Sequence, residues 1–289
     1  MGRMGVSVIT QSSMRAQTLR CLDSLPKMSP MVAHLLAQLS RRNCEIHDLA
    51  ETVERDPVLS AQVLRLANSA IFGRLRPVSS VRHAIAMIGT GALRKFALGS
   101  SISNLFSRTK LAKHFSVRRF NVHSVATATL LELLSEELPF ESGEDAFLAG
   151  LMHDIGKMLV ASSFPQQYDD ILALTAVNGA TLIEAERDVL GIDHAELSSL
   201  AILRWDLSEA LQTAARDHHQ PRESAGKPGL SLGIHYVDAY INHLGMSVLP
   251  LPLPCQKADS LEIPGFAFSQ ERVLEGFARE IQTLGKLFG

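Results

Sequence analysis

This chain has little of several features that mark specialised classes of protein. Charge is scarce and balanced: charged residues make up 20% of its 289 residues, with 28 basic against 30 acidic side chains. Such a balance gives no reason to expect a disordered tail or a chain held on nucleic acid by bulk charge. The 46% of hydrophobic residues can supply the core of one large domain or of two medium ones.

Cysteines and long apolar runs are also few. Cys21, Cys44 and Cys255 are odd in number and widely spaced, so we expect free thiols rather than a disulfide or a zinc site. No apolar run reaches the roughly eighteen residues that cross a bilayer, and the N-terminal residues lack the apolar block of a signal peptide. These absences predict a cytoplasmic protein.

Apolar residues at helical spacing, by contrast, run through most of the sequence. Pro57 suits the first turn of a helix with Asp56 as its N-cap, and Asn68-Ser69 close that helix or present a polar patch to a partner. The pattern predicts helices over 30–39, 46–53, 57–67, 79–89, 93–106 and 270–288. No alternation of polar and apolar residues is long enough to predict a strand, so the expected fold class is all-α.

One dipeptide, His153-Asp154, has further histidines and aspartates on both sides of it. The full set is His123, His153, Asp154, His194, His218, His219 and Asp238. Imidazole and carboxylate are ligand types that borderline and hard divalent cations choose. The order of the set resembles the metal-binding pattern of the HD superfamily of helical phosphohydrolases. That resemblance implies one or two divalent ions, iron, manganese or zinc, with the aspartate of the dipeptide bridging two ions.

Each of these residues also has a plainer interpretation. A single buried histidine is more often a hydrogen-bonded core residue than a ligand, and His194 could simply follow Asp193 as an N-cap. Consecutive residues on one helix point about 100° apart, so His153 and Asp154 need ligands from other helices to form a compact site. Six histidines match no ligand position and are expected at the surface or in packing: His34, His47, His83, His114, His235 and His243.

A second resemblance covers the first half of the chain. The segments 56–60, 64–69 and 84–89 are similar to the signature of the HDOD family, and the segment 190–196 followed by Arg204-Trp205 also fits it. Members are bacterial signalling proteins in which an HD-like bundle follows an all-helical N-terminal part, and they are generally regarded as non-catalytic. We therefore expect a flexible N-terminus at 1–16, a helical subdomain at 17–110, an HD-like bundle with the metal site at 111–245, and a Pro-rich strap with a C-terminal helix at 246–289.

Two classes of function follow from these resemblances. In the favoured one, the chain is a regulatory module that contacts another signalling protein through the helices between Leu25 and Phe106, with a nucleotide or phosphate ester as an additional ligand. In the other, it is a metal-dependent phosphohydrolase in which Asp154 and Lys157 are catalytic. Metal ions held by histidine and aspartate can lower the pKa of a bound water and neutralise phosphoryl charge. Lys157 could meet a phosphate, or it could be solvated.

Two further features bear on that choice. Related HD-GYP cyclic-di-GMP phosphodiesterases carry a Gly-Tyr-Pro element shortly after the paired histidines, whereas residues 220–229 contain none, so efficient hydrolysis of that substrate is not expected. The N-terminal half has a basic tendency, for which a solvated face is the default interpretation and an acidic partner or a nucleotide the alternative. The basic residues concerned are Arg74, Arg76, Arg82, Arg94 and Lys95.

Overall fold

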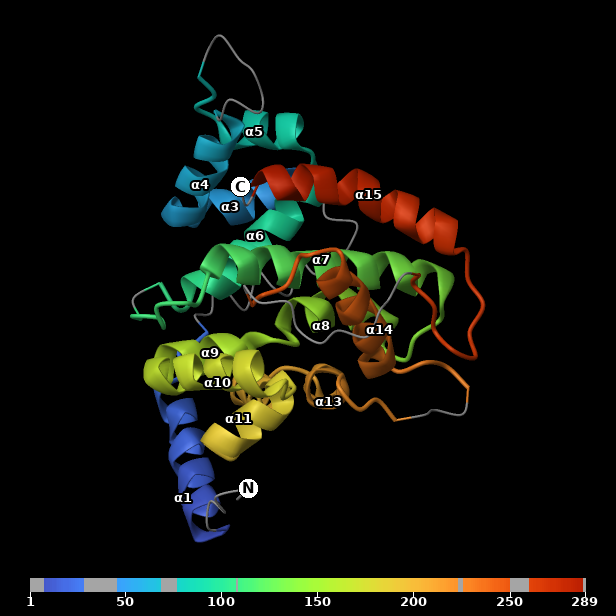
Figure 1. Ribbon diagram of the computed structural model, residues 1–289. Coiled ribbons are helices and arrows are strands. Elements are labelled where there is room, and N and C mark those ends of the chain that lie inside the picture. The colour runs from blue at the N-terminus through green and yellow to red at the C-terminus, as the bar shows by residue number, and fades with distance from the viewer. Residues whose placement is uncertain are drawn as a thin grey trace.

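The computed structural model describes residues 8–28, 46–68, 77–107, 109–222, 226–249 and 260–287. Within these ranges the regular elements are helices and no strand occurs, which confirms the all-α prediction (Figure 1). The expected helix at 30–39 lies outside the described residues, as do His34, Cys44, Ser69, Arg74, Arg76 and Cys255. None of the described helices combines the length and the apolar character that a membrane span requires.

The N-terminal helices follow their capping signals. They are α3 (Ile46–Glu54), α4 (Pro57–Ala67), α5 (Val81–Ile88) and α6 (Thr90–Asn104). Asp56 caps α4 by accepting hydrogen bonds from the backbone N–H groups of Val58 and Leu59, at 2.8 and 3.0 Å. The Asn68 side chain donates to the carbonyl of Val78 and accepts from its N–H, at 2.7 and 2.6 Å. Asn68 therefore has a structural role at the end of α4.

A long helix, α7 (Val117–Glu137), organises the second half of the chain (Figure 1). The helices that follow it are α8 (Ala146–Met152), α9 (Ile155–Ser163), α10 (Pro165–Asn178), α11 (Leu182–Leu190), α12 (His194–Arg204), α13 (Glu209–Asp217) and α14 (Leu230–His243). Small residues let α7 and α8 approach closely: a Cβ added at Gly150 would lie 2.6 Å from the Cα of Ala128. This close contact brings the end of α8 against the middle of α7.

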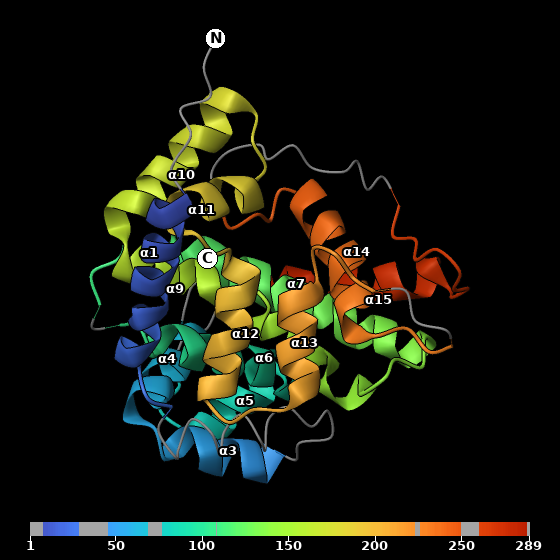
Figure 2. The ribbon, with the colours of Figure 1, turned by 90° about the horizontal axis from the view of Figure 1, so that it is seen from below.

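The described part of the segment expected to be a flexible N-terminus, residues 8–16, is helical. Residues Val8–Leu19 form α1, and Arg20–Ser24 form a short 3-10 helix, η1. Thr18 donates to the carbonyl of Leu190 at 3.0 Å, and Arg15 donates to that of Gly191 at 3.1 Å. Because these contacts join residues far apart in the sequence, periodicity alone did not reveal them. Figure 2 shows α1 lying beside α11.

The C-terminal helix, α15 (Gln270–Leu287), packs on α7 and α6 with Val273 and Phe277 buried (Figure 1). Beneath it, Arg94 and Lys95 are each only 2% exposed, so the interpretation of a solvated basic face is wrong for these two residues. Arg94 donates to Glu132 at 2.6 Å, and Lys95 pairs with both Glu132 and Glu280. Buried charges of this kind require such partners.

Candidate metal centre

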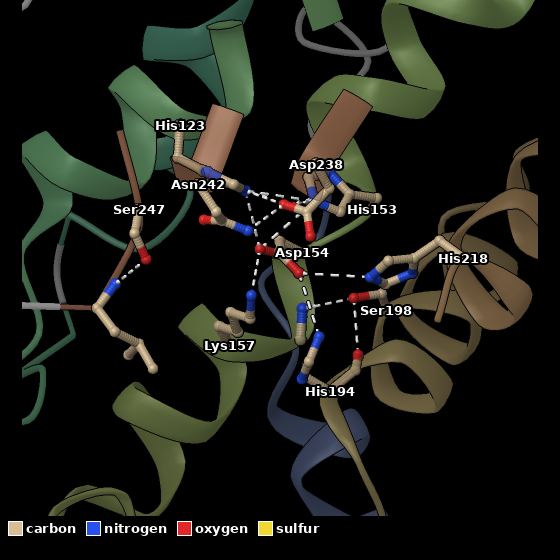
Figure 3. A network of polar contacts seen from close by, with 12 residues as sticks. His123, His153, Asp154, Lys157, His194, Ser198, His218, Asp238, Asn242 and Ser247 are labelled. Atoms are coloured by element: carbon tan, nitrogen blue, oxygen red, sulfur yellow. Dashed lines mark hydrogen bonds and ion pairs between the residues drawn. The ribbon is translucent and has the colours of Figure 1, made fainter. Parts of the chain in front are cut away.

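All seven ligand-type residues that the sequence singled out lie together in the bundle, in two adjoining groups. Figure 3 labels all of them except His219. The inner group is His123 on α7, His153 and Asp154 between α8 and α9, and Asp238 on α14. The outer group is His194 at the start of α12 with His218 and His219 at the end of α13. In each group, one potential ligand atom from every residue lies within 4.8 Å of all the others.

The inner group converges on the Nε2 atom of His123. That atom lies 3.1 Å from Oδ1 of Asp238, 3.3 Å from Oδ2 of Asp154 and 3.4 Å from Nε2 of His153. His123, His153 and Asp154 have no solvent exposure, and Asp238 has 9%. Two carboxylates and two imidazoles thus share a nearly closed space.

The outer group consists of imidazoles alone. The Nε2 atoms of His194 and His219 are 2.9 Å apart, and the rings of His218 and His219 have centroids 3.9 Å apart. His194 and His218 are buried, whereas His219 is only half-buried. This group therefore differs from the inner one in both charge and exposure.

Asp154 connects the two groups through its two carboxylate oxygens. Oδ2 faces His123 and His153, while Oδ1 lies 3.3 Å from Nε2 of His194 and 3.9 Å from Nε2 of His218. Oδ1 of Asp154 and Nε2 of His218 are both buried without a hydrogen-bond partner. Buried polar atoms seldom lack a hydrogen-bond partner. Each one that does needs an explanation, such as an ion or a water that would meet it.

The histidine rings are anchored by their outward nitrogens. Nδ1 of His123, His153 and His218 donates to the carbonyls of Met246, Gly150 and Ala215, at 2.9, 2.8 and 2.7 Å. Nδ1 of His194 donates instead to the carboxylate of Glu186, at 2.6 Å. With Nδ1 directed outward, each of these Nε2 atoms faces the centre of the cluster, where it can bind an ion once it carries no proton. This is the arrangement in which metal-binding histidines are held.

The charges of the cluster shift its pKa values strongly. Burial by itself lowers the pKa of His123, but Asp154 and Asp238 outweigh it and raise the value to about 9. The same opposition, with Glu186 as the main raising group, brings the pKa of His194 to about 9. Burial lowers the pKa of His218 to about 3 and also lowers that of His219. Burial acts to raise the pKa values of Asp154 and Asp238, yet neighbouring histidines, with Lys157 at Asp154, hold both well below the ordinary range.

Lys157 lies inside the centre, so the alternative of a solvated lysine is wrong. Its side chain is 8% exposed, and its ammonium donates to Oδ2 of Asp154 at 2.5 Å. Burial acts to lower the pKa of Lys157, but the Asp154 charge raises it, so the lysine stays charged. Oδ2 of Asp154, which faces the inner histidines, is thus also paired with the Lys157 ammonium.

The chain breaks its helix at the His153-Asp154 dipeptide, which resolves the difficulty of two consecutive ligands. Because α8 ends at Met152 and α9 begins at Ile155, both side chains face one centre. Gly156 then lies against α12: a Cβ there would overlap the carbonyl oxygen of His194. The Ser198 hydroxyl accepts from the N–H of Gly156 at 2.9 Å and donates to that His194 carbonyl at 2.8 Å. This contact fixes the distance between α9 and α12.

Sequence reasoning missed three residues that hold the ligand-type side chains. Glu186 accepts from both the ring and the backbone N–H of His194, Asn242 donates to Asp238 at 2.9 Å, and His235 donates to the carbonyl of His218 at 2.8 Å. Asn242 is four residues after Asp238 on one helix, a spacing that could have revealed it. The other described histidines, His47, His83, His114 and His243, lie outside both groups, as expected.

The residues present suit a divalent cation. They offer convergent imidazole and carboxylate groups, anchored rings, and two buried atoms without partners. This cluster of histidines and aspartates could therefore bind a metal.

Comparison with known proteins agrees with the fold. The HDOD domain model matches residues 25–221. An HDOD domain protein of unknown function from Geobacter sulfurreducens superposes with a TM-score of 0.71 at 22% identity, covering 97% of this chain and 99% of that one. A proposed phosphohydrolase from Shewanella amazonensis SB2B has a TM-score of 0.68 at 24% identity, covering 95% of this chain and 99% of that one. At such identities these likenesses show the fold alone.

A curated relative is much longer than this chain. It is an uncharacterized protein of Treponema pallidum (strain Nichols), 19% identical over 203 residues. The match covers 68% of this chain and 38% of the relative, so this chain spans well under half of that protein's length.

Proposed function

This chain belongs to the HDOD family, and from that premise we propose that it is a regulatory signalling module whose bundle holds one or two divalent metal ions, iron, manganese or zinc. The observation that supports the proposal is the position of Asp154: Oδ2 faces the inner histidines, and Oδ1, which has no hydrogen-bond partner, lies 3.3 Å from Nε2 of His194. A buried carboxylate oxygen without a partner is costly, and a cation would remove that cost.

Each group would hold one ion. His123, His153, Asp154 and Asp238 would serve the inner ion, and His194, His218 and His219 with Oδ1 of Asp154 would serve the outer one. Such ions, when bound, polarise phosphoryl oxygens and activate water. Lys157 holds Oδ2 of Asp154 in place, while Glu186 orients the His194 ring and fixes its proton on Nδ1.

The regulatory part of the proposal concerns the helices between Leu25 and Phe106. We propose that they contact another signalling protein. This assignment is supported by the resemblance to signalling proteins. It is also supported by the location of the two ligand-type groups, which among the described residues both lie between His123 and Asp238. The first half of the chain thus has no described group of this kind to suggest chemistry of its own.

A phosphohydrolase is the second candidate, and the buried ammonium of Lys157 favours it, since a charge beside two proposed ions could meet a phosphate. Against it stands the segment 220–229, which lacks the Gly-Tyr-Pro element associated with cyclic-di-GMP hydrolysis. Productive attack needs the phosphate held in line, and misplacement alone can remove most of the rate.

Elemental analysis of protein purified without chelators, joined to a panel of phosphate esters and cyclic dinucleotides, tests the proposal. We expect bound transition metal and little or no turnover of cyclic-di-GMP. Less than about a tenth of an equivalent of metal after attempted reconstitution would contradict the proposed metal centre, because such a site should bind tightly. Turnover of cyclic-di-GMP at about 1 s⁻¹ or faster, lost in Asp154→Ala, would establish the hydrolase instead.

A further inference from the structure

We propose that a small phosphate monoester reaches the metal centre through a cavity beside His219, and that Arg222 at its rim recognises the phosphate; this rests on the proposed metal centre. The cavity has a volume of about 640 Å³ and is formed by the first turns of α11 and α12 and by the end of α13. Figure 2 shows α12 and α13 side by side. The volume suits a small molecule.

His219 is what connects this cavity to the centre. It lines the cavity and is half-buried, whereas His194 and His218 behind it are at most 1% exposed. Its Nε2 atom lies 2.9 Å from that of His194, which in turn lies 3.3 Å from Oδ1 of Asp154. A ligand in the cavity would therefore meet the outer group first.

The acidic side chains that line the cavity are already engaged. Asp193 accepts from Arg187 at 2.8 Å and from the N–H of Glu196 at 2.9 Å. The Glu196 carboxylate pairs with Arg15 on α1, and Glu184 completes a capping box with Thr181. These carboxylates therefore oppose an incoming anion less than their number suggests.

The arginines at the end of α13 differ in how much of their donor capacity is used. Arg216 donates to both oxygens of Asp217, at 2.8 and 3.0 Å. Arg222 lies 4.0 Å from the same carboxylate, and its side chain is 86% exposed. A guanidinium held so loosely can turn to a phosphate, which it matches with two parallel hydrogen bonds.

The remaining lining indicates what is attached to the phosphate. Apart from aliphatic parts such as Ile183 and Ala195, the residues that line the cavity are polar or charged, and none is a phenylalanine, tyrosine or tryptophan. Nucleobases are usually held by stacking on aromatic rings or guanidinium planes, and among the lining residues only His219 and the arginines offer such a surface. A small hydrophilic phosphate monoester therefore fits this cavity better than a cyclic dinucleotide.

The test uses full-length protein loaded with Mn²⁺, with metal content measured first. The probes are inorganic phosphate, glycerol phosphate and cyclic-di-GMP. Their binding is measured by the paramagnetic relaxation of their ³¹P signals and by titration calorimetry. We expect phosphate and glycerol phosphate to relax strongly and cyclic-di-GMP weakly. Arg222→Gln should weaken glycerol phosphate binding about tenfold, as for one charge-assisted contact, without changing metal content.

Arg279→Gln is the matched control, because Arg279 is also exposed and lies 3.8 Å from an acidic partner, Glu275, but on α15. Equal weakening by both variants, or no relaxation of ³¹P in metal-loaded protein, would overturn the cavity proposal and leave the metal centre intact. Tighter binding of cyclic-di-GMP than of glycerol phosphate would overturn the assignment of ligand class. Protein that takes up no Mn²⁺ would remove the metal centre and this proposal with it.

Discussion

The inner and outer groups share Asp154 but differ in almost every other respect. The inner group contains two carboxylates, Asp154 and Asp238, and borders the charged Lys157. The outer group contains three imidazoles, of which His218 and His219 have lowered pKa values because of burial. The inner group is nearly closed, whereas the outer one meets a cavity at His219.

In the proposed metal centre, this difference would give the two sites different exchange behaviour. The inner carboxylates are nearly closed off from water, so a cation bound there should be released slowly. The outer group has no carboxylate of its own and meets a cavity, so an outer ion should exchange readily and accept an outside ligand. In the proposed centre the inner ion would therefore be structural, and the outer ion would be the one that responds to an outside ligand.

The largest effect should come from the residue that both groups share. Asp154→Ala removes the carboxylate from both sites, and we expect both ions to be lost. His194→Ala removes one outer imidazole, which water can often replace, so the inner ion should stay. Competition titration with a chelator measures both variants. Equal losses, or a greater loss in His194→Ala, would contradict the bridging role.

Gly156→Ala should separate the two groups by pushing α12 away from α9. A Cβ would overlap the His194 carbonyl, and such overpacking costs about 1–3 kcal/mol in free energy of unfolding. We expect a lower melting temperature and loss of the outer ion with the inner one retained. Gly91→Ala is the control, because a Cβ there meets nothing within 4 Å. If Gly156→Ala leaves metal binding at the outer site unchanged, the contact between Gly156 and the His194 carbonyl does not position that site.

The sequence allowed the helices to be predicted better than the contacts between them. Asp56 and Pro57 signal the start of α4 locally, and the structure agrees. The order of histidines and aspartates, read through a family resemblance, identified all seven residues that the structure brings together.

Pairing between distant residues escaped that reasoning. Lys95 resembles a solvated lysine until Glu280, 185 residues away, is placed beside it. Glu186 lies eight residues before His194, and only the turn at Gly191 directs its carboxylate back to that ring. Neither partner follows from periodicity, because periodicity describes which face is buried and not what meets it.

A smaller effect is expected from Glu186→Gln. The amide cannot supply the negative charge that holds the Nδ1 proton of His194, and loss of such a partner typically costs 10–100-fold in metal affinity. The outer ion alone should weaken. Glu184→Gln, on the same helix but exposed, controls for the substitution. Isothermal titration with Mn²⁺ distinguishes the two sites, and equal weakening of both would show that Glu186 does not belong to the outer group alone.

A change of one pH unit should have the mildest effect, and it should act on both groups. His123 and His194, with pKa values of about 9 when no metal is bound, are protonated at neutral pH, and each must lose a proton to bind an ion. Affinity should therefore rise about tenfold per pH unit at each site and level off near pH 9. Calorimetry in buffers of different ionisation enthalpy counts the released protons. Affinity that falls as pH rises from 6 to 8 would contradict these protonation states.

The central claim is an inner ion held tightly and an outer ion held loosely on opposite oxygens of Asp154. The most direct measurement is anomalous X-ray diffraction from crystals of the protein with one and with two equivalents of Mn²⁺. We expect the first equivalent among His123, His153, Asp154 and Asp238, and the second among the outer histidines. Two results would contradict this assignment. One is an outer site that fills first; the other is no Mn²⁺ in either group with one or with two equivalents, which would leave Lys157 as the cation of the centre.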